Sequence, residues 1–263
     1  MVATGGWARG LHDVGISAQQ RLHLAALLIV AVAFPAAAQD IRFDPRITQE
    51  EFRKFSRTVG QGIFATPVQP ARAAGLLGFD VGIAVTAVEV DEKAAYWTRA
   101  VEDDFSTGGY VGVPRLVASK GFGFGTVSAT YAKLSDSGIS TWGGAVDVPI
   151  IEGGLVRPTL ALRGSYATLQ GSDAFEAKTW GVEAFLSKGF GPVTPYGAVG
   201  RMRVDARGTI PATSTTPEIV LSDESDVDRF TLGVRLSLFI PKIVIEATQA
   251  EVRSYAAKVS IGF

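Results

Sequence analysis

The chain has 263 residues, with 25 Lys and Arg against 26 Asp and Glu, so its formal net charge is −1. A near-neutral chain of this kind lacks the basic surface that nucleic-acid binding requires. The sequence contains no cysteine, which excludes disulfide bonds, thiolate metal sites and a lipidated cysteine. Its mean hydropathy of +0.22 is high for a water-soluble protein.

The first 38 residues are predicted to be a leader and a secretory signal peptide. Arg21 precedes an apolar run over residues 22–34, and Pro-Ala-Ala-Ala at 35–38 supplies an A-x-A cleavage site. The run is too short to cross a bilayer as a helix. The alternative is a signal anchor that is never removed. Cleavage after residue 38 would remove both histidines of the chain.

Residues 39–77 are predicted to be a periplasmic segment that contains an amphipathic helix at 48–59 and a linker. Thr48 and Glu51 match the T-x-x-E pattern of a capping box. The apolar face of this helix consists of Phe52, Phe55 and Val59. Two placements remain open: a plug or gate in the mouth of a barrel, or a helix across the periplasmic rim or on the membrane surface.

Residues 78–263 alternate between apolar and polar side chains in ten segments. Such alternation indicates strands whose two faces meet different solvents. The segments are 79–87, 111–120, 122–134, 141–150, 157–166, 179–187, 196–205, 229–238, 243–248 and 254–263. Four tight connections rich in Gly or Pro alternate with more variable ones, of which 91–110 and 206–227 are long and polar.

This pattern predicts an all-β fold: an antiparallel up-and-down transmembrane β-barrel of about ten strands, with a short helix before it. Bacterial barrels have an even strand number, short periplasmic turns and longer outer loops. If both termini are periplasmic, the four tight turns lie in the periplasm and the loops 91–110 and 206–227 lie outside the cell. A soluble barrel of the lipocalin kind would reverse the two faces.

Aromatic side chains are expected to form two girdles at the membrane interfaces, with outer-membrane lipid between them. Amphipathic rings favour the headgroup region of a bilayer. The outer girdle is predicted to contain Trp142, Tyr166 and Trp180, and the periplasmic girdle Phe79, Tyr196 and Phe263.

The polar faces of the strands are expected to line the lumen with seven cations and five anions. The cations are Arg157, Arg163, Arg201, Arg203, Arg229, Arg235 and Lys258, and the anions are Asp80, Asp147, Glu183, Asp205 and Glu246. One interpretation is a polar channel with a slight anion preference. The other is a lumen filled by Arg–carboxylate pairs, which does not conduct.

No enzymatic activity, cofactor or metal site is predicted. The two histidines, His12 and His23, lie in the leader, so the mature chain has no histidine base. The acidic stretch at residues 223–228 lacks the glycine and the terminal glutamate of an EF-hand loop, which favours a solvated outer loop.

The chain resembles the small bacterial outer-membrane barrels of the opacity-protein class, which include porin-like proteins. The sequences Tyr-Ala-Ala-Lys-Val-Ser-Ile-Gly-Phe at 255–263 and Val-Thr-Pro-Tyr-Gly-Ala-Val-Gly at 193–200 carry this resemblance. It implies an integral outer-membrane location and a C-terminal signal that the barrel insertion machinery reads. The signal residues would be Tyr255, Val259, Ile261 and Phe263. The N-terminal helix is similar to the plug of the fatty-acid transporters, whose barrels are larger.

Two functions follow from this sequence as alternatives. The first is a narrow pore that passes a small solute through the outer membrane. The second is a non-conducting structural or adhesive barrel that acts through its outer loops, 91–110 and 206–227.

Overall fold

The computed structural model describes residues 41–263 except for 73, 102–107, 135–137, 155, 213, 215–216 and 239–240. The predicted leader and signal peptide lie outside the described residues, as do parts of the predicted loops 91–110 and 206–227. Within the described residues, no helix is long and apolar enough to cross a membrane.

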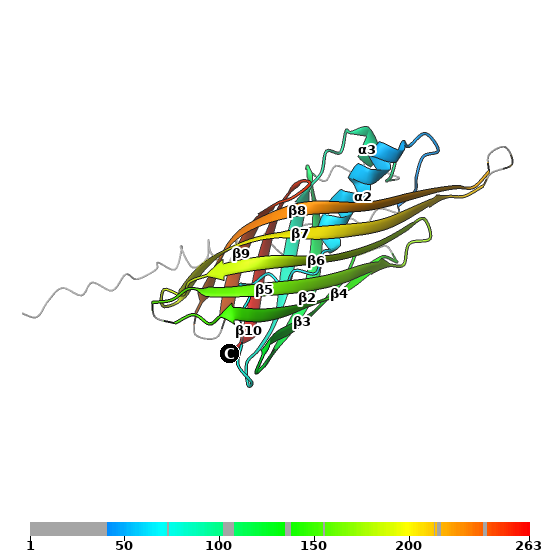
Figure 1. Ribbon diagram of the computed structural model, residues 1–263. Coiled ribbons are helices and arrows are strands. Elements are labelled where there is room, and N and C mark those ends of the chain that lie inside the picture. Colours follow the sequence, from blue (N-terminus) through cyan, green and yellow to red (C-terminus); the bar gives the residue numbers. More distant parts are fainter. Residues whose placement is uncertain are drawn as a thin grey trace, which may run out of the picture. The chain divides into compact units, whose positions relative to one another are not determined.

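Ten antiparallel strands close into a barrel, in which each strand pairs with its neighbours along the chain and β1 pairs with β10 (Figure 1). The strands are β1 (Phe79–Glu89), β2 (Tyr110–Phe122), β3 (Gly125–Lys133), β4 (Ser140–Ile151), β5 (Thr159–Gln170), β6 (Phe175–Ser187), β7 (Val193–Ile210), β8 (Ile219–Ser237), β9 (Pro241–Gln249) and β10 (Arg253–Gly262). The predicted up-and-down barrel of ten strands is confirmed. Closure removes the exposed edges of an open sheet, except where β8 extends beyond β9, with which it pairs only from Phe230 to Ser237.

The two ends of the barrel differ. β1 begins and β10 ends at the same end, where Asp80 pairs with Gly262. The connections β2–β3, β4–β5, β6–β7 and β8–β9 also lie there, and we call it the short-turn end. At the opposite end β7 and β8, with 18 and 19 residues, extend far beyond the 9-residue β9. We call this the long-strand end.

The predicted outer loop 206–227 is mostly strand. The β7–β8 ladder continues without interruption to the pair Ile210 and Ile219, so only residues 211–218 connect the two strands. The acidic stretch at 223–228, predicted as a solvated loop, therefore belongs to β8. Alternation between buried and exposed residues continues through it, because its odd-numbered residues face the interior.

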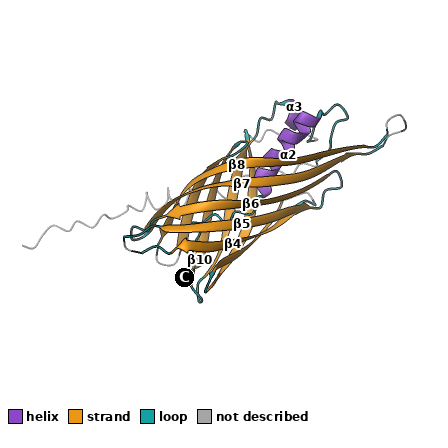
Figure 2. Ribbon diagram, in the orientation of Figure 1, coloured by secondary structure: helices purple, strands orange, loops and turns teal. Residues whose placement is uncertain are grey.

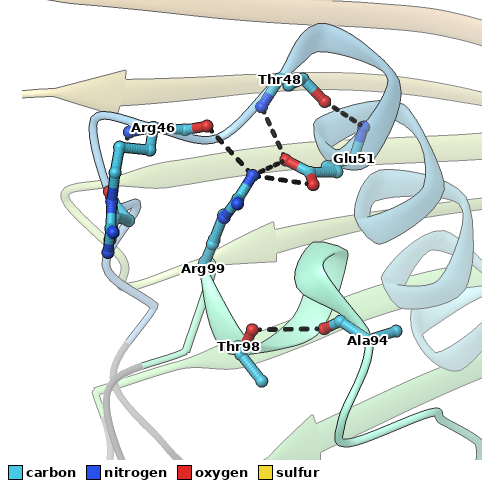
Figure 3. Close-up of polar contacts among 7 residues, drawn as sticks. Arg46, Thr48, Glu51, Ala94, Thr98 and Arg99 are labelled. Atoms are coloured by element: carbon cyan, nitrogen blue, oxygen red, sulfur yellow. Dashed lines mark hydrogen bonds and ion pairs between the residues drawn. The ribbon is translucent and has the colours of Figure 1, made fainter.

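The predicted N-terminal helix is present as α2 (Gln49–Ile63), one turn longer than expected at its C-terminal end. The predicted capping box is formed: the Thr48 N–H donates to Glu51 Oε2 over 2.8 Å, and the Glu51 N–H donates to Thr48 Oγ1 over 3.3 Å. This backbone donation from Thr48 lowers the pKa of Glu51 below its usual value. Figure 3 shows Arg99, just after the four-residue helix α3 (Ala95–Thr98), donating to both oxygens of the same carboxylate at 2.9 Å.

Helix α2 lies within the barrel at the long-strand end, beside α3 (Figures 1 and 2). Phe52 and Phe55 are fully buried in a cluster with side chains from the inner faces of β5 to β8. At the helix C-terminus, Gln61 donates to Ser254 Oγ in β10 over 2.8 Å. Of the two predicted placements, the structure therefore shows the plug in the barrel mouth.

The first described residues also lie at the long-strand end. Ile41 forms an isolated bridge with Val101 in the β1–β2 connection, whereas Phe263 bonds to Phe79 at the short-turn end. The sequence predicts that residues 39–77 and the C-terminus lie on the same, periplasmic side of the membrane. The structure instead places Ile41 and Phe263 at opposite ends, because the chain between α2 and β1 passes through the barrel.

Two glycines of α2 test how tightly the helix fits the wall. A Cβ on Gly60 would lie 2.7 Å from Val204 Cγ2 in β7, whereas one on Gly62 would lie 3.6 Å from the nearest atoms of Val88 and Val113. Ala is favoured over Gly in a helix by about 1 kcal/mol. We expect Gly62→Ala to be neutral or stabilising, and Gly60→Ala to lower stability by about 1–3 kcal/mol through overpacking. Urea unfolding of the refolded protein checks this; equal midpoints for the two variants would contradict the tight contact.

Candidate functional site

The lumen contains a segment of the chain itself. After α2, residues 64–77 run without regular secondary structure to the start of β1. Phe64, Ala65, Val68 and Ala71 are fully buried in this segment. Irregular backbone inside a barrel has amides and carbonyls that need partners. Side chains from several strands supply those partners, so we take the segment and its contacts as the candidate functional site.

Arg115 of β2 binds the start of the segment, next to the end of α2. Its guanidinium donates to the carbonyl oxygens of Phe64, at 2.8 Å, and Gly62, at 2.7 Å. These carbonyls stand at the end of α2, where no further turn of helix provides donors. Arg115 is only 4% exposed, so this interaction takes place away from bulk water.

Gln69 is the central contact of the segment. Its side chain donates to Ser119 Oγ of β2 at 3.2 Å and accepts from Lys258 Nζ of β10 at 2.8 Å. Its carbonyl oxygen accepts from Arg163 of β5 at 3.0 Å. One residue of the segment is thus bound to strands on different sides of the barrel, which fixes its position across the lumen.

Buried ion pairs surround the segment. Arg163 binds Asp147 through two contacts of 2.6 and 2.9 Å, and neither side chain is more than 1% exposed. Arg229 binds Glu183 at 3.2 Å, and its guanidinium lies 4.3 Å from the centre of the Phe64 ring. Buried charges are tolerated when they are paired in this way. The two pairs occupy the lumen around the segment, and each pair carries no net charge.

A second group of charged side chains surrounds the segment at the short-turn end. Asp80 accepts from Lys258 at 3.0 Å, Ser260 at 3.0 Å and Lys242 at 3.2 Å. Beside it, Thr126 Oγ1 donates to the carbonyl oxygen of Arg72 at 2.7 Å. The segment is therefore bound near the long-strand end, at its centre and near the short-turn end.

Val68 indicates how strongly these contacts constrain the segment. Its φ of 49° lies in the left-handed region, which β-branched residues rarely adopt, and the side chain is fully buried. Such a conformation costs about 1–3 kcal/mol and persists where surrounding contacts compensate. The Val68 N–H donates to Thr66 Oγ1 at 3.2 Å, which satisfies the backbone at this position.

The structure places eight of the twelve predicted lumen residues on inner faces of the barrel. These are Arg163, Arg229, Arg235, Lys258, Asp80, Asp147, Glu183 and Glu246. Four lie elsewhere, contrary to the prediction. Arg157 is exposed in the β4–β5 connection, and Arg201, Arg203 and Asp205 point outward from β7.

The outward charges of β7 form a ladder with β8. Arg201 binds Asp228 at 2.8 Å, and Arg203 binds Asp226 at 2.8 Å. The inner face of β7 at this height carries Met202 and Val204, which pack on α2. The prediction placed polar residues on the inner face along the whole length of the barrel. Near the long-strand end the helix makes the interior apolar, and the charged side chains of β7 lie on the outer face.

Of the six predicted girdle residues, five lie on the outer face and one lies inside the barrel. Trp142, Tyr166, Trp180, Phe79 and Phe263 are exposed on the outer face. Tyr196, predicted to join the periplasmic girdle, instead points inward and donates to Glu246. Its ring lies over Gly233, where an added Cβ would be 2.4 Å from the Tyr196 ring.

Between these aromatic residues, the outer face is an apolar band. Its exposed side chains are Val81, Ile83, Leu116, Val127, Val146, Val148, Leu162, Val182, Leu186, Val199, Phe230, Leu232, Ile245, Tyr255, Val259 and Ile261. Toward the long-strand end the apolar band stops abruptly on β7. There the exposed Val199 is followed, at the next outward-facing positions, by Arg201 and Arg203. At this border the Arg203 guanidinium lies 5.6 Å from the centre of the Trp180 ring.

Sequence reasoning missed several residues that hold the segment. Arg115, Gln69 and Arg72 lie in parts of the sequence assigned to a weak strand and to a linker, and Lys242 was assigned to a turn. The polar residues of the predicted linker, such as Gln69 and Arg72, were the only sequence feature that could have indicated buried polar contacts there. Within the described residues, no three acidic or histidine side chains come together as a metal site.

A closed antiparallel barrel with an apolar outer band, bordering aromatic residues and charged inner faces has the architecture of a transmembrane β-barrel. Neither a protein-family model nor a curated protein matches the chain. Among solved structures, the N-terminal β-barrel domain of Pseudomonas aeruginosa OprF is 11% identical, with a TM-score of 0.31, over 70% of this chain and 97% of that domain. The attachment invasion locus protein Ail of Yersinia pestis is 9% identical, with a TM-score of 0.29, over 70% and 95%. The KdgM porin is 8% identical, with a TM-score of 0.33, over 70% and 99%. These values assign the chain to no family.

The buried pair Arg163–Asp147 should behave as one unit. Removing one partner of such a pair costs about 3–5 kcal/mol, because the other charge stays buried without compensation. We expect Asp147→Asn to destabilise the refolded protein strongly, and Asp147→Asn combined with Arg163→Met to be less destabilised than the sum of the single variants. Urea unfolding followed by tryptophan fluorescence measures this double-mutant cycle. Strict additivity would show that the two side chains do not depend on each other.

Proposed function

We propose that the protein is an integral bacterial outer-membrane barrel whose own N-terminal segment keeps the lumen closed. It acts through its surface at the long-strand end and not as an open pore. The observation that carries the proposal is the attachment of residues 62–74 to β2, β3, β5 and β10 by buried polar contacts.

The apolar outer band supports membrane insertion. A continuous band of exposed Val, Leu, Ile and Phe around a barrel is much larger than the apolar patches of soluble monomers. Its strands contain at least 9 residues, and a tilted transmembrane strand needs about 9–11. Closed barrels that cross with strands are characteristic of bacterial outer membranes, which supports this location over the inner membrane.

The occupied lumen favours the non-conducting alternative. Small barrels of about eight strands are filled by their own side chains, and ten strands leave room for little more. Here that room holds α2 above and residues 64–74 below, each with satisfied contacts to the wall. The proposal assigns no catalytic activity; residues 41–263 contain no histidine base.

The surface that remains for interaction is the extension of β7 and β8. Its outward side chains form a hydrated ladder of ion pairs, Arg201 with Asp228 and Arg203 with Glu224 and Asp226. The β1–β2 connection has a different role, since α3 packs on α2 and Arg99 binds Glu51. Under this proposal the strand extension, which ends at Ile210 and Ile219, is the structural or adhesive element. Reading of Phe263 by the insertion machinery stays a prediction.

Conductance in a planar bilayer tests the closed lumen. We expect the refolded protein to be silent, with folding verified by heat-sensitive migration on a gel. Arg115→Met removes both donors to the carbonyls of Gly62 and Phe64, and an unsatisfied buried group costs about 1–3 kcal/mol. This variant should show brief openings that the unmodified protein lacks. Long-lived discrete steps from the unmodified protein would contradict the proposal and favour the narrow pore.

Surface labelling tests the orientation. An epitope inserted between Pro211 and Ala212 should be labelled by antibody on intact bacteria, because it would lie at the tip of the outer extension. The same epitope between Gly153 and Gly154, in a short turn, should become accessible only after the outer membrane is permeabilised. The opposite pattern would place the long-strand end in the periplasm.

A further inference from the structure

The segment leaves one part of the lumen unfilled. At the short-turn end it binds the wall of β2, β3 and β10, through Ser119, Thr126 and Lys258. On its other side lies a cavity of about 410 Å³, between Pro70, Arg72 and Gly75 of the segment and the inner faces of strands β4 to β8. The cavity opens at the short-turn end, where residues of the tight turns form its rim.

Two arginines line this cavity and have no carboxylate partner. Arg72 comes from the segment and Arg235 from β8, and both also line a smaller adjoining cavity with Lys242 and Lys258. No ion pair joins either arginine to a carboxylate within the part of the chain that the structure describes. The buried Nε of Arg235 has no hydrogen-bond partner, and its Nη2 has a long contact of 3.4 Å to Thr194 Oγ1.

The charge balance around the cavities is positive. Four cations, Arg72, Arg235, Lys242 and Lys258, face two carboxylates. One of these, Asp80, already binds both lysines, at 3.0 and 3.2 Å. The other, Glu152, is exposed on the β4–β5 connection. Elsewhere in the lumen Arg163 and Arg229 have carboxylate partners, and Arg115 donates to two backbone carbonyls. Among the residues that the structure describes, Arg72 and Arg235 have neither kind of close partner for their guanidinium groups.

We infer that this cavity is a binding site for a small soluble anion that carries phosphate or carboxylate groups. Guanidinium groups bind such anions through paired, charge-assisted hydrogen bonds. The cavity volume is within the range of small-molecule sites. A bound anion would contact the guanidinium groups of Arg72 and Arg235. Because Arg72 belongs to the segment, the anion would also link the segment to β8, a strand that none of its polar contacts described above reaches.

Binding of inorganic phosphate to the refolded full chain tests the inference. Titration calorimetry in zwitterionic micelles at constant ionic strength should give saturable binding of one phosphate, with competition by succinate. Arg72→Gln combined with Arg235→Gln should weaken phosphate binding by about a hundredfold, roughly tenfold for each charged hydrogen-bonding group. The matched control, Arg157→Gln combined with Arg253→Gln, removes two exposed arginines outside the cavity and should keep the unmodified affinity.

Three results would overturn the inference. They are the absence of saturable phosphate binding, an equal loss of affinity in both double variants, and phosphate binding abolished by phosphatidylglycerol added to the micelles. The last would show that a lipid headgroup, not a soluble anion, is the ligand. Heat-sensitive gel migration of each variant ensures that a loss of binding is not a loss of the barrel. This test is independent of the conductance experiment, because a closed lumen and an open one both leave the cavity accessible.

Discussion

Irregular backbone inside a barrel must find hydrogen-bond partners there, and the arrangement of the lumen depends on this requirement. The described residues of 64–77 form no helix or strand. Within them the Thr66 N–H donates to the Phe64 carbonyl oxygen at 2.8 Å, and other backbone groups bond to side chains of the strands. Arg115 and Arg163 supply donors to carbonyls at 2.7–3.0 Å, and Thr126 bonds to the backbone on both sides of position 73. Two ion pairs lie around the segment, Arg163 with Asp147 and Arg229 with Glu183.

The chemistry of the two barrel faces changes with height. Within the apolar band the outer face of β7 exposes Val199, and the inner face carries Thr194 and Tyr196. Above the band the outer face carries Arg201 and Arg203, and the inner face packs on α2 through Met202 and Val204. A single strand can therefore alternate regularly along its whole length while its polar residues move from one face to the other.

The change of polar residues from the inner to the outer face of β7 explains why some features can be predicted from the sequence and others cannot. The ten strands, their antiparallel order and the capping box at Thr48 depend on local patterns, and alternation reveals them without knowledge of the interior. The direction of each face depends on what fills the lumen. Tyr196 was assigned to the lipid face because aromatic residues favour the interface, but it donates to Glu246 and covers Gly233. Gln69 is a polar residue of the linker, but its partners Ser119 and Lys258 lie 50 and 189 residues away in the chain, so no local pattern identifies them.

The passage of the chain through the barrel restricts the order in which the protein can assemble. Ile41 lies at the long-strand end and β1 begins at the short-turn end, so the barrel encircles the residues between them. A helix with side chains is about 10–12 Å wide, and the lumen below α2 is occupied by Val68, Gln69 and the charged side chains around them. Closure of the β1–β10 seam around a segment already in position would avoid passing the folded helix through this lumen. Once that seam is closed, α2 can leave only through the long-strand end.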